Sequence, residues 1–492
     1  MLRERRRNGS VVIYRVFLAV MIAAVVLFLA RVASGELESD FSVGQLIHLS
    51  QNYEMGDIYD GNGELIAKGS RKSSLEYERE TTATAFQDII GADISQTLGI
   101  RNNICSNALY IYGTETNALD MKNLIVPSKS VKKGGDVKLT IRKDLQEHLA
   151  AMIAESGYEK AYVVVSNYKN GEVLAMYSNG GNCLDAMLPP GSTMKPFYLA
   201  AALSVDPQLV DYTYDCEADS HDFGSGVQAV HINCAGKANH GVTDYTNAMA
   251  KSCNAWFSSS LDRLDQDKLL EAMKIWGFDS SYSFSQFRYM DHTFDGKNGS
   301  NSTVAKALIA GMKKLGIDYR EKRLRYEVIG QGNAHITVEA MNFLTGALLN
   351  EGVLKEPVWI KAKRTSATDG EWKKLKRENE YIMCQKDVAE TVVRTLEEVM
   401  ESGTGRSFAM PEAGFVGKTG TAQKADKNGN LNGMQTVWFT GGLTGEFGEA
   451  NPIAITMAFD DVDSSVTSSA AGTFAKDVLT YMLTEEGGSK DE

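Results

Sequence analysis

The sequence predicts an α/β (α+β) protein whose largest domain has a mostly antiparallel sheet flanked by helices. Residues 161–177 contain an apolar strand, an Asn170-Gly171 turn and a second strand, which is the pattern of a tight β-hairpin. Residues 415–423 and 436–441 are two further strands joined by a polar loop, and they predict a second hairpin. Amphipathic helices are expected beside this sheet, one at residues 144–156 and a last one whose apolar face consists of Phe474, Val478 and Met482.

The N-terminal region predicts a membrane anchor. Four arginines lie in residues 1–10, before an apolar stretch at residues 11–33 that reaches the ~20 residues of a membrane span if Arg15 snorkels. Positive charge before the span keeps the N-terminus inside and places the following chain outside. The alternative is a signal peptide cleaved near Ser34. We favour the retained anchor, because the stretch is long for a signal peptide and no lipid-acceptor cysteine follows it.

Composition bounds the class of protein. A chain of 492 residues that is 43% hydrophobic can bury a large core and exceeds one typical domain. A net charge of -12, without a basic stripe that carries aromatic residues, argues against nucleic acid as a partner. A phosphate-binding loop is excluded because it requires glycine where Glu412 stands, five residues before Gly417.

Three short motifs, in one order along the chain, carry the functional prediction. They are Ser192-Thr193-Met194-Lys195 directly after Pro189-Pro190-Gly191, then Ser252-Cys253-Asn254, then Lys418-Thr419-Gly420-Thr421. Each motif alone is common, and a solvated helix face or a turn would explain it. All three in this order indicate an acyl-transfer site.

The residue types suit that chemistry. A serine hydroxyl is a weak nucleophile that needs a base nearby, and the three-residue spacing of Ser192 and Lys195 places both on one helical face. Lysine acts as a base only when neutral, and burial or a neighbouring cation such as Lys418 would lower its pKa. The prolines and Gly191 predict that the helix begins at Ser192, so that its positive end favours a developing oxyanion.

The motif set resembles the penicillin-binding proteins and serine β-lactamases. Residues 56–67 are similar to the segment that opens the extracellular part of class B penicillin-binding proteins, although Met55 and Gly61 stand where arginines are common. Residues 330–332 and 403–405 also resemble the transpeptidase domain, and no segment resembles the glycosyltransferase module of class A proteins.

The resemblance implies a β-lactamase/transpeptidase-like domain behind a small stalk domain. The expected organisation is a cytoplasmic tail at 1–10, a transmembrane anchor at 11–33, a dimerisation-like stalk at 34–140, a transpeptidase domain at 141–484 and a polar tail at 485–492. The catalytic domain would lie outside the cell membrane of a bacterium. The implied activity is a peptidoglycan D,D-transpeptidase that cross-links stem peptides through a serine acyl-enzyme, and that β-lactams acylate.

Each motif residue receives a role from the family. Ser192 would be the nucleophile and Lys195 its base, Ser252 a proton relay, and Asn254 a holder of Lys195 and of the substrate amide. Lys418, Thr419, Gly420 and Thr421 would bind the substrate carboxylate, and the N–H groups of Ser192 and Thr421 would form the oxyanion hole. A SEDS-type membrane glycosyltransferase is the implied partner. No cofactor and no metal are expected.

Two other functions share the motifs. A β-lactam hydrolase or sensor is less favoured, because the Glu-x-x-Leu-Asn segment by which class A β-lactamases activate water is missing. An inactive scaffold that activates a glycosyltransferase would tolerate loss of motif residues, yet all are present.

The six cysteines leave alternatives open. Cys216 and Cys234 flank a segment with His221 and His231, and His240 follows, so a disulfide, free thiols or a metal site are all compatible with the sequence. The metal site is the least favoured, because the spacing fits no standard zinc pattern. Cys253 is interpreted as a small packed side chain. Since Cys216 and Cys234 belong to no motif, both are predicted to be dispensable for acylation.

Overall fold

The computed structural model describes residues 53–90, 132–278 and 324–484, apart from short gaps within each range, and a few positions outside them. The tails at 1–10 and 485–492 lie outside the described residues, and of the expected anchor at 11–33 only Met21 and Val26 are described. Across the described part of the chain, no helix combines the length and the apolar character needed to cross a membrane.

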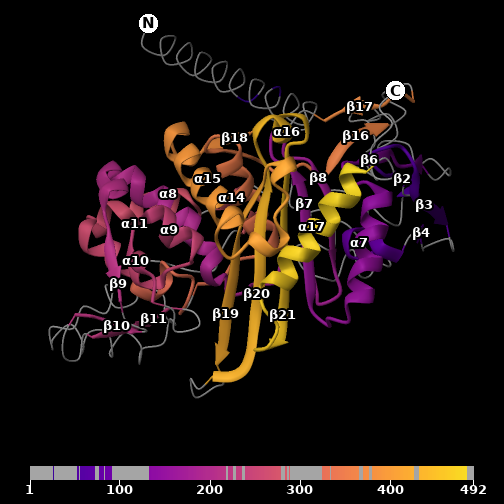
Figure 1. Cartoon of the computed structure of the whole chain (residues 1–492). Coiled ribbons are helices and arrows are strands. Elements are labelled where there is room, and N and C mark those ends of the chain that lie inside the picture. The colour runs from indigo at the N-terminus through magenta and orange to yellow at the C-terminus, as the bar shows by residue number, and fades with distance from the viewer. Residues whose placement is uncertain are drawn as a thin grey trace, which may run out of the picture.

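A five-stranded antiparallel sheet forms the centre of the molecule, as Figure 1 shows. Its order is β19-β20-β21-β7-β8, and its strands are β19 (Phe415–Ala425), β20 (Leu431–Leu443), β21 (Ile453–Asp463), β7 (Ala161–Asn167) and β8 (Val173–Ser178). Both predicted hairpins are confirmed, and β21 joins them by pairing with β20 and with β7. The predicted fold class, a mostly antiparallel sheet flanked by helices, is therefore confirmed for this domain.

Helices cover both faces of this sheet. On one face, α14 (Val338–Leu349) is buried along its whole length and contacts the strands through hydrogen bonds between hydroxyl and amide side chains. These bonds connect Asn342 to Ser166 and Thr456, and Thr345 to Thr440. On the other face, Phe474 of α17 (Ser469–Leu483) packs edge-on against Phe459, and α7 (Lys143–Ser156) packs on β8.

A second sheet combines strands from distant parts of the sequence. Its order is β17-β16-β6-β2-β3-β4, and its strands are β2 (Ile58–Tyr59), β3 (Leu65–Arg71), β4 (Tyr77–Thr81), β6 (Asp136–Leu139), β16 (Ile360–Arg364) and β17 (Lys373–Lys374). Gln146 of α7 links the segment that follows β4 to β8 of the central sheet, because its buried amide donates to the carbonyls of Ala85 and Met176. The strands β16 and β17 therefore belong to the region after residue 140, yet they complete a sheet whose other strands precede that residue.

A helical lobe lies beside β19 (Figure 1). It contains α8 (Lys195–Val205), α9 (Tyr245–Ala250), α10 (Asn254–Ser259), α11 (Gln266–Ile275) and α15 (Lys386–Glu401). The helix α8 is mostly apolar, and it is buried from Lys195 to Leu203. Two small strand pairs extend from this lobe, β9 (Tyr214–Cys216) with β12 (Gly241–Thr243) and β10 (Ser220–Phe223) with β11 (Val230–Asn233).

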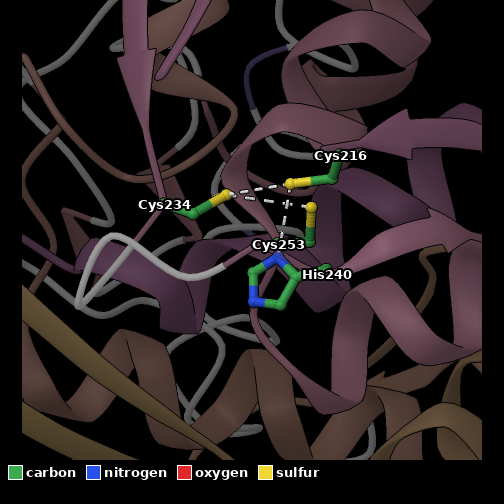
Figure 2. A group of neighbouring side chains, drawn as sticks. All are labelled: Cys216, Cys234, His240 and Cys253. Carbon is green, nitrogen blue, oxygen red and sulfur yellow. Dashed lines mark hydrogen bonds between the residues drawn. The ribbon is translucent and has the colours of Figure 1, made fainter. Parts of the chain in front are cut away.

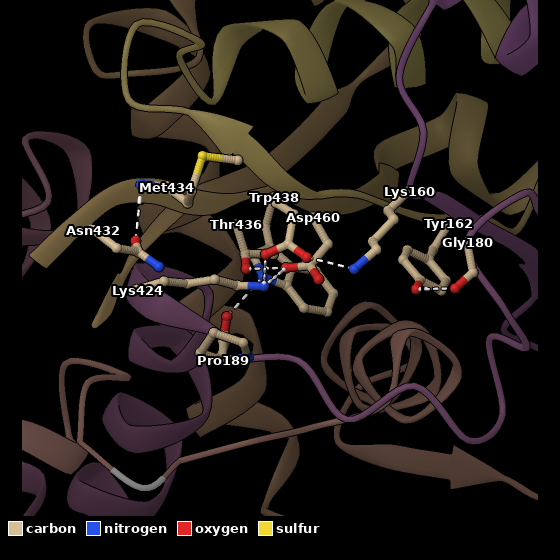
Figure 3. Close-up of polar contacts among 11 residues, drawn as sticks. Lys160, Tyr162, Gly180, Pro189, Lys424, Asn432, Met434, Thr436, Trp438 and Asp460 are labelled. Atoms are coloured by element: carbon tan, nitrogen blue, oxygen red, sulfur yellow. Dashed lines mark hydrogen bonds and ion pairs between the residues drawn. The ribbon is translucent and has the colours of Figure 1, made fainter. Parts of the chain in front are cut away.

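Polar contacts fix the β19–β20 hairpin against its neighbours, as Figure 3 shows. Lys424 lies 2.6 Å from the buried carboxylate of Asp460 on β21, which also accepts a hydrogen bond from Thr436. Nearby, the indole N–H of Trp438 donates to the carbonyl of Pro189 at 2.9 Å. This last bond ties β20 to the chain segment that leads into the first motif.

Candidate active site

Ser192 lies in a tight turn at the start of α8. The turn is a 3-10 helix, Gly191–Met194, and α8 begins at Lys195, so the predicted helix start at Ser192 is shifted by one turn. Lys195 donates its backbone N–H to the carbonyl of Ser192 and thereby joins the turn to the helix. Ser192 is half-buried, and its hydroxyl makes no hydrogen bond to any residue that the structure describes.

The third motif on β19 lies directly against this turn. Gly191 has φ +56°, and a Cβ on it would stand 2.5 Å from the carbonyl oxygen of Thr421. A Cβ on Gly420 would stand 2.8 Å from the Thr193 side chain. Gly330, with φ +72°, accepts a hydrogen bond from Gly191 N at 3.0 Å, and a Cβ there would stand 1.8 Å from Gly191 O. These glycines permit the turn that carries Ser192 to approach β19 closely.

The second motif occupies the turn between α9 and α10. Ser252 adopts φ +56°, one of the few positive values at a non-glycine residue in the described part of the chain. Such a conformation costs about 1–3 kcal/mol and persists only where the surroundings enforce it. Here Cys253 enforces it from the next position, because its backbone N–H donates to Ala248 and its sulfur accepts from Trp256 N.

Lys195 brings the first two motifs together. Its amine is fully buried and lies 2.8 Å from Ser252 O, 3.0 Å from Ser252 Oγ and 2.7 Å from Asn254 Oδ1. Burial lowers the pKa of Lys195 to about 8. A neutral amine has two N–H groups for the two carbonyl-type acceptors, which leaves its lone pair for a hydroxyl proton. The geometry therefore suits a lysine that acts as a base.

Ser252 Oγ lies between two lysines. Lys418 Nζ is 3.1 Å from Ser252 Oγ and donates to its neighbour's carbonyl, Thr419 O, at 3.0 Å. Lys418 is fully buried, and desolvation, together with the charge of Lys195, lowers its pKa well below the usual value. From the sequence, a lowered pKa was predicted for Lys195 alone. Both pKa values are lowered, so burial and the repulsion between the two amines disfavour a charge on both at once.

Thr419 connects this site to the segment 403–405. Its hydroxyl lies 2.6 Å from the hydroxyl of Thr404, and Thr404 N donates to the carbonyl of Ala250 at the end of α9. A Cβ on Gly403 would stand 2.3 Å from that same carbonyl. The sequence indicated this segment without a role for it, and in the structure it contacts the third motif through Thr404 and Thr419.

Of the three states that the sequence allows for Cys216 and Cys234, the structure is compatible with free thiols or a metal site. The sulfur atoms of Cys216 and Cys234 are 3.8 Å apart and both residues are free thiols, so the disulfide is not formed. Cys216, Cys234, His240 and Cys253 place one ligand atom each within 4.8 Å of one another. His231 is not part of this cluster, because its exposed ring pairs with Asp222. The sequence did not indicate that Cys253 belongs to this cluster, since nothing in the second motif itself shows that Cys253 lies close to Cys216, Cys234 and His240.

The domain that carries these motifs matches a known family. Residues 161–480 match the model of the penicillin-binding protein transpeptidase domain, which is more than half of the chain. The chain belongs to this family. It is 26% identical over 332 residues to the stage V sporulation protein D of Bacillus subtilis, covering 63% of this chain and 48% of that protein. It is 22% identical over 392 residues to the peptidoglycan D,D-transpeptidase MrdA of Acinetobacter baumannii, covering 75% of this chain and 52% of that protein.

Solved structures of the family share this fold. The penicillin-binding protein A of Mycobacterium tuberculosis, solved as a ceftriaxone acyl-enzyme, superposes with a TM-score of 0.68 at 16% identity, over 89% of this chain and all of that one. A D,D-transpeptidase domain from Eggerthella lenta gives a TM-score of 0.64 at 21% identity, over 88% of this chain and 98% of that one. At these identities the likeness shows the fold alone. The chain spans about half the length of the curated relatives it matches.

We expect Gly330→Ala to destabilise the penicillin-binding fold by about 3 kcal/mol, because the new methyl group adds an overlap with Gly191 O to the left-handed strain. Gly433→Ala is the matched control, since Gly433 has φ +77° and open space around it, and we expect it to cost only about 1 kcal/mol. Denaturant unfolding of both variants measures the difference. Equal losses would show that the approach of the Ser192 turn to Gly330 is not tight.

Proposed function

We propose that this protein is a peptidoglycan D,D-transpeptidase that forms an acyl-enzyme at Ser192 and that β-lactams acylate. One observation carries the proposal: Ser252 Oγ lies between the buried amines of Lys195 and Lys418, and Lys195 directly follows the turn that contains Ser192. This constellation combines a nucleophile, a base, a relay and an anion-binding group within one site. Family membership and the name of the relative MrdA support the same activity.

In the first step, Ser192 Oγ attacks the carbonyl of the penultimate D-alanine and forms the C–O bond. Its proton moves to the lone pair of neutral Lys195, which keeps its N–H bonds to Ser252 O and Asn254 Oδ1 throughout. The N–H groups of Ser192 and Thr421 stabilise the oxyanion, and each donor contributes roughly 3 kcal/mol to such a site. The closeness of Gly191 to the backbone of Thr421 supports this pairing.

The second step breaks the C–N bond of the peptide. The departing D-alanine amine takes its proton from Ser252, which regains one from Lys195 across the 3.0 Å contact. Lys418 binds the terminal carboxylate together with Thr419 and Thr421, and Gly420 permits the close approach of that strand to the Ser192 turn. Burial lowers the pKa of Lys418 and so favours its neutral form. The negative charge of the bound carboxylate raises this pKa again and favours the protonated amine, which binds the carboxylate.

The acyl group then passes to the amine of a neighbouring stem peptide. Hydrolysis is the competing outcome that would make the protein a β-lactam hydrolase. Within the described residues, Lys195 is the base adjacent to Ser252, and no carboxylate is hydrogen-bonded to the motif residues. Acylation by a β-lactam should therefore trap the enzyme.

We propose an anchor at 11–33, a stalk at 34–140 that shares its sheet with β16 and β17, and a catalytic domain from 141 to 484 outside the bacterial membrane. The relatives named stage V sporulation protein D and peptidoglycan D,D-transpeptidase MrdA support this placement. A SEDS-type glycosyltransferase is the proposed membrane partner, by family resemblance.

The two lysines provide the test of the mechanism. Lys195→Arg should abolish labelling by a fluorescent penicillin, because guanidinium cannot lose its proton. Lys418→Arg keeps a cation for the carboxylate and should retain labelling, slowed on the order of tenfold by altered geometry. The readout is the rate of adduct formation on a gel, with folding checked by circular dichroism. Ser192→Ala is the blank and should give no adduct. Labelling of folded Lys195→Arg together with inert Lys418→Arg would refute the assignment.

The pH dependence follows from the pKa of Lys195. Acylation requires the neutral amine, so its rate should rise about tenfold per pH unit up to pH ~8 and level off above it. Stopped-flow acylation by a chromogenic β-lactam across this range measures the profile. A rate that is flat between about pH 6 and about pH 8 would contradict a lysine base with this pKa.

The anchor predicts the N-terminus of the mature protein. N-terminal sequencing of protein purified from membranes should find residues 1–10 retained. Protease added to the outside of the membrane should cut the chain after residue 33 and leave residues 1–10 intact. A mature chain that begins near Ser34 would instead establish the signal peptide.

A further inference from the structure

Four potential metal ligands converge behind the second motif. Figure 2 shows Cys216, Cys234 and Cys253 with their sulfur atoms directed toward one another, and His240 with a ring nitrogen facing the same point. The three cysteines are buried and His240 is half-buried. Their ligand atoms all lie within 4.8 Å of one another.

Three of the distances between the ligand atoms match those of a tetrahedral site, and the others are at most 4.8 Å. With Zn–S bonds of about 2.3 Å and a Zn–N bond of about 2.0 Å, tetrahedral angles require about 3.8 Å between sulfur atoms and about 3.5 Å between sulfur and nitrogen. Cys234 Sγ lies 3.8 Å from Cys216 Sγ and 3.9 Å from Cys253 Sγ, and Cys216 Sγ lies 3.5 Å from His240 Nδ1. Three thiols and an imidazole are a donor set that selects zinc over magnesium or calcium.

Neighbouring groups hold the ligands in place. The backbone N–H of His240 donates to the carbonyl of Cys216, and the backbone N–H of Trp256 donates to Cys253 Sγ at 3.5 Å. His221 Nε2 lies 3.4 Å from Cys216 Sγ, while its Nδ1 lies 3.1 Å from the Tyr214 hydroxyl. Hydrogen bonds of this kind from an outer layer orient ligands in metal sites.

The cluster joins elements that lack a core of their own. Cys216 ends β9, Cys234 follows β11, His240 precedes β12, and Cys253 caps α10. The pairs β9–β12 and β10–β11 are two-stranded sheets, which are marginally stable alone. A bond between their ends would fix both pairs to the helical lobe.

The same cluster supports the catalytic turn. Cys253 lies between Ser252, with its positive φ, and Asn254, and both of these residues contact Lys195. Asn254 Nδ2 also donates to the carbonyl of Asn233, the residue before Cys234, at 2.8 Å. Two of the four ligands are thus adjacent in sequence to groups that position the lysine amine.

We propose that Cys216, Cys234, His240 and Cys253 bind one structural zinc ion, which holds Ser252 and Asn254 in their positions around Lys195. All four coordination positions come from the protein, so the ion has no open position for substrate and acts by positioning. This reverses the sequence-based expectation that Cys216 and Cys234 are dispensable.

Metal content tests the site independently of activity. The full chain, purified without chelator, should contain one zinc per chain by elemental mass spectrometry. Replacement by Co²⁺ should give thiolate-to-cobalt charge-transfer absorption and tetrahedral visible bands. Cys216→Ser and His240→Ala should each lose the ion, whereas the matched control Cys384→Ser, a buried free cysteine outside the cluster, should retain it.

The effect on acylation rests on the proposed function and is measured separately. Removal of zinc from the wild-type chain with a chelator should lower the rate of penicillin labelling on the order of 10²-fold, and added Zn²⁺ should restore it. This arm needs no variant, so misfolding of a variant cannot decide it. A chain that binds zinc and is never acylated would refute the proposed function and leave the metal site standing.

Three results would overturn the metal site. They are a native chain that lacks metal and whose three thiols all react with a thiol reagent, a Cys216–Cys234 disulfide found by mass spectrometry, and equal zinc content in Cys216→Ser and wild type.

Discussion

The active site depends on the burial of two amines around one hydroxyl. Removal of an ammonium group from water is costly, so a buried lysine persists only where acceptors surround it or where it gives up its proton. Lys195 has three polar partners from the second motif, and Lys418 shares one of them, the Ser252 hydroxyl. Three elements meet this requirement together: the α9–α10 turn supplies Ser252, α8 supplies Lys195, and β19 supplies Lys418.

Most of the sheet could be predicted from the sequence, because its signals are local. An Asn-Gly turn between alternating strands and apolar positions at helical spacing require no knowledge of distant residues, and both hairpins and both flanking helices are confirmed. The second sheet could not be predicted in the same way. β16 pairs with β6 more than two hundred residues earlier in the chain, and no local pattern specifies that pairing.

The candidate site shows the same division. The spacing of Ser192 and Lys195 is local and indicated a shared helical face, but the bond between Lys418 and Ser252 joins residues 166 positions apart. The burial of Lys418 depends on that long-range packing, so its lowered pKa was not foreseen. The sequence indicated Cys216, Cys234 and His240 as one alternative for a metal site, but it did not indicate Cys253, because the approach of the second motif to the ends of β9, β11 and β12 depends on long-range packing.

The contacts among Gly191, Gly330 and Gly420 have an evolutionary consequence. Each backbone lies so close to its neighbour that a single added methyl group would displace the turn that carries Ser192. Under the proposed function, a substitution at these positions that lowered sensitivity to a β-lactam would also displace Ser192 from its own substrate. Routes to antibiotic resistance would then avoid these positions, and adaptive changes would accumulate at residues around the site whose side chains have room to vary.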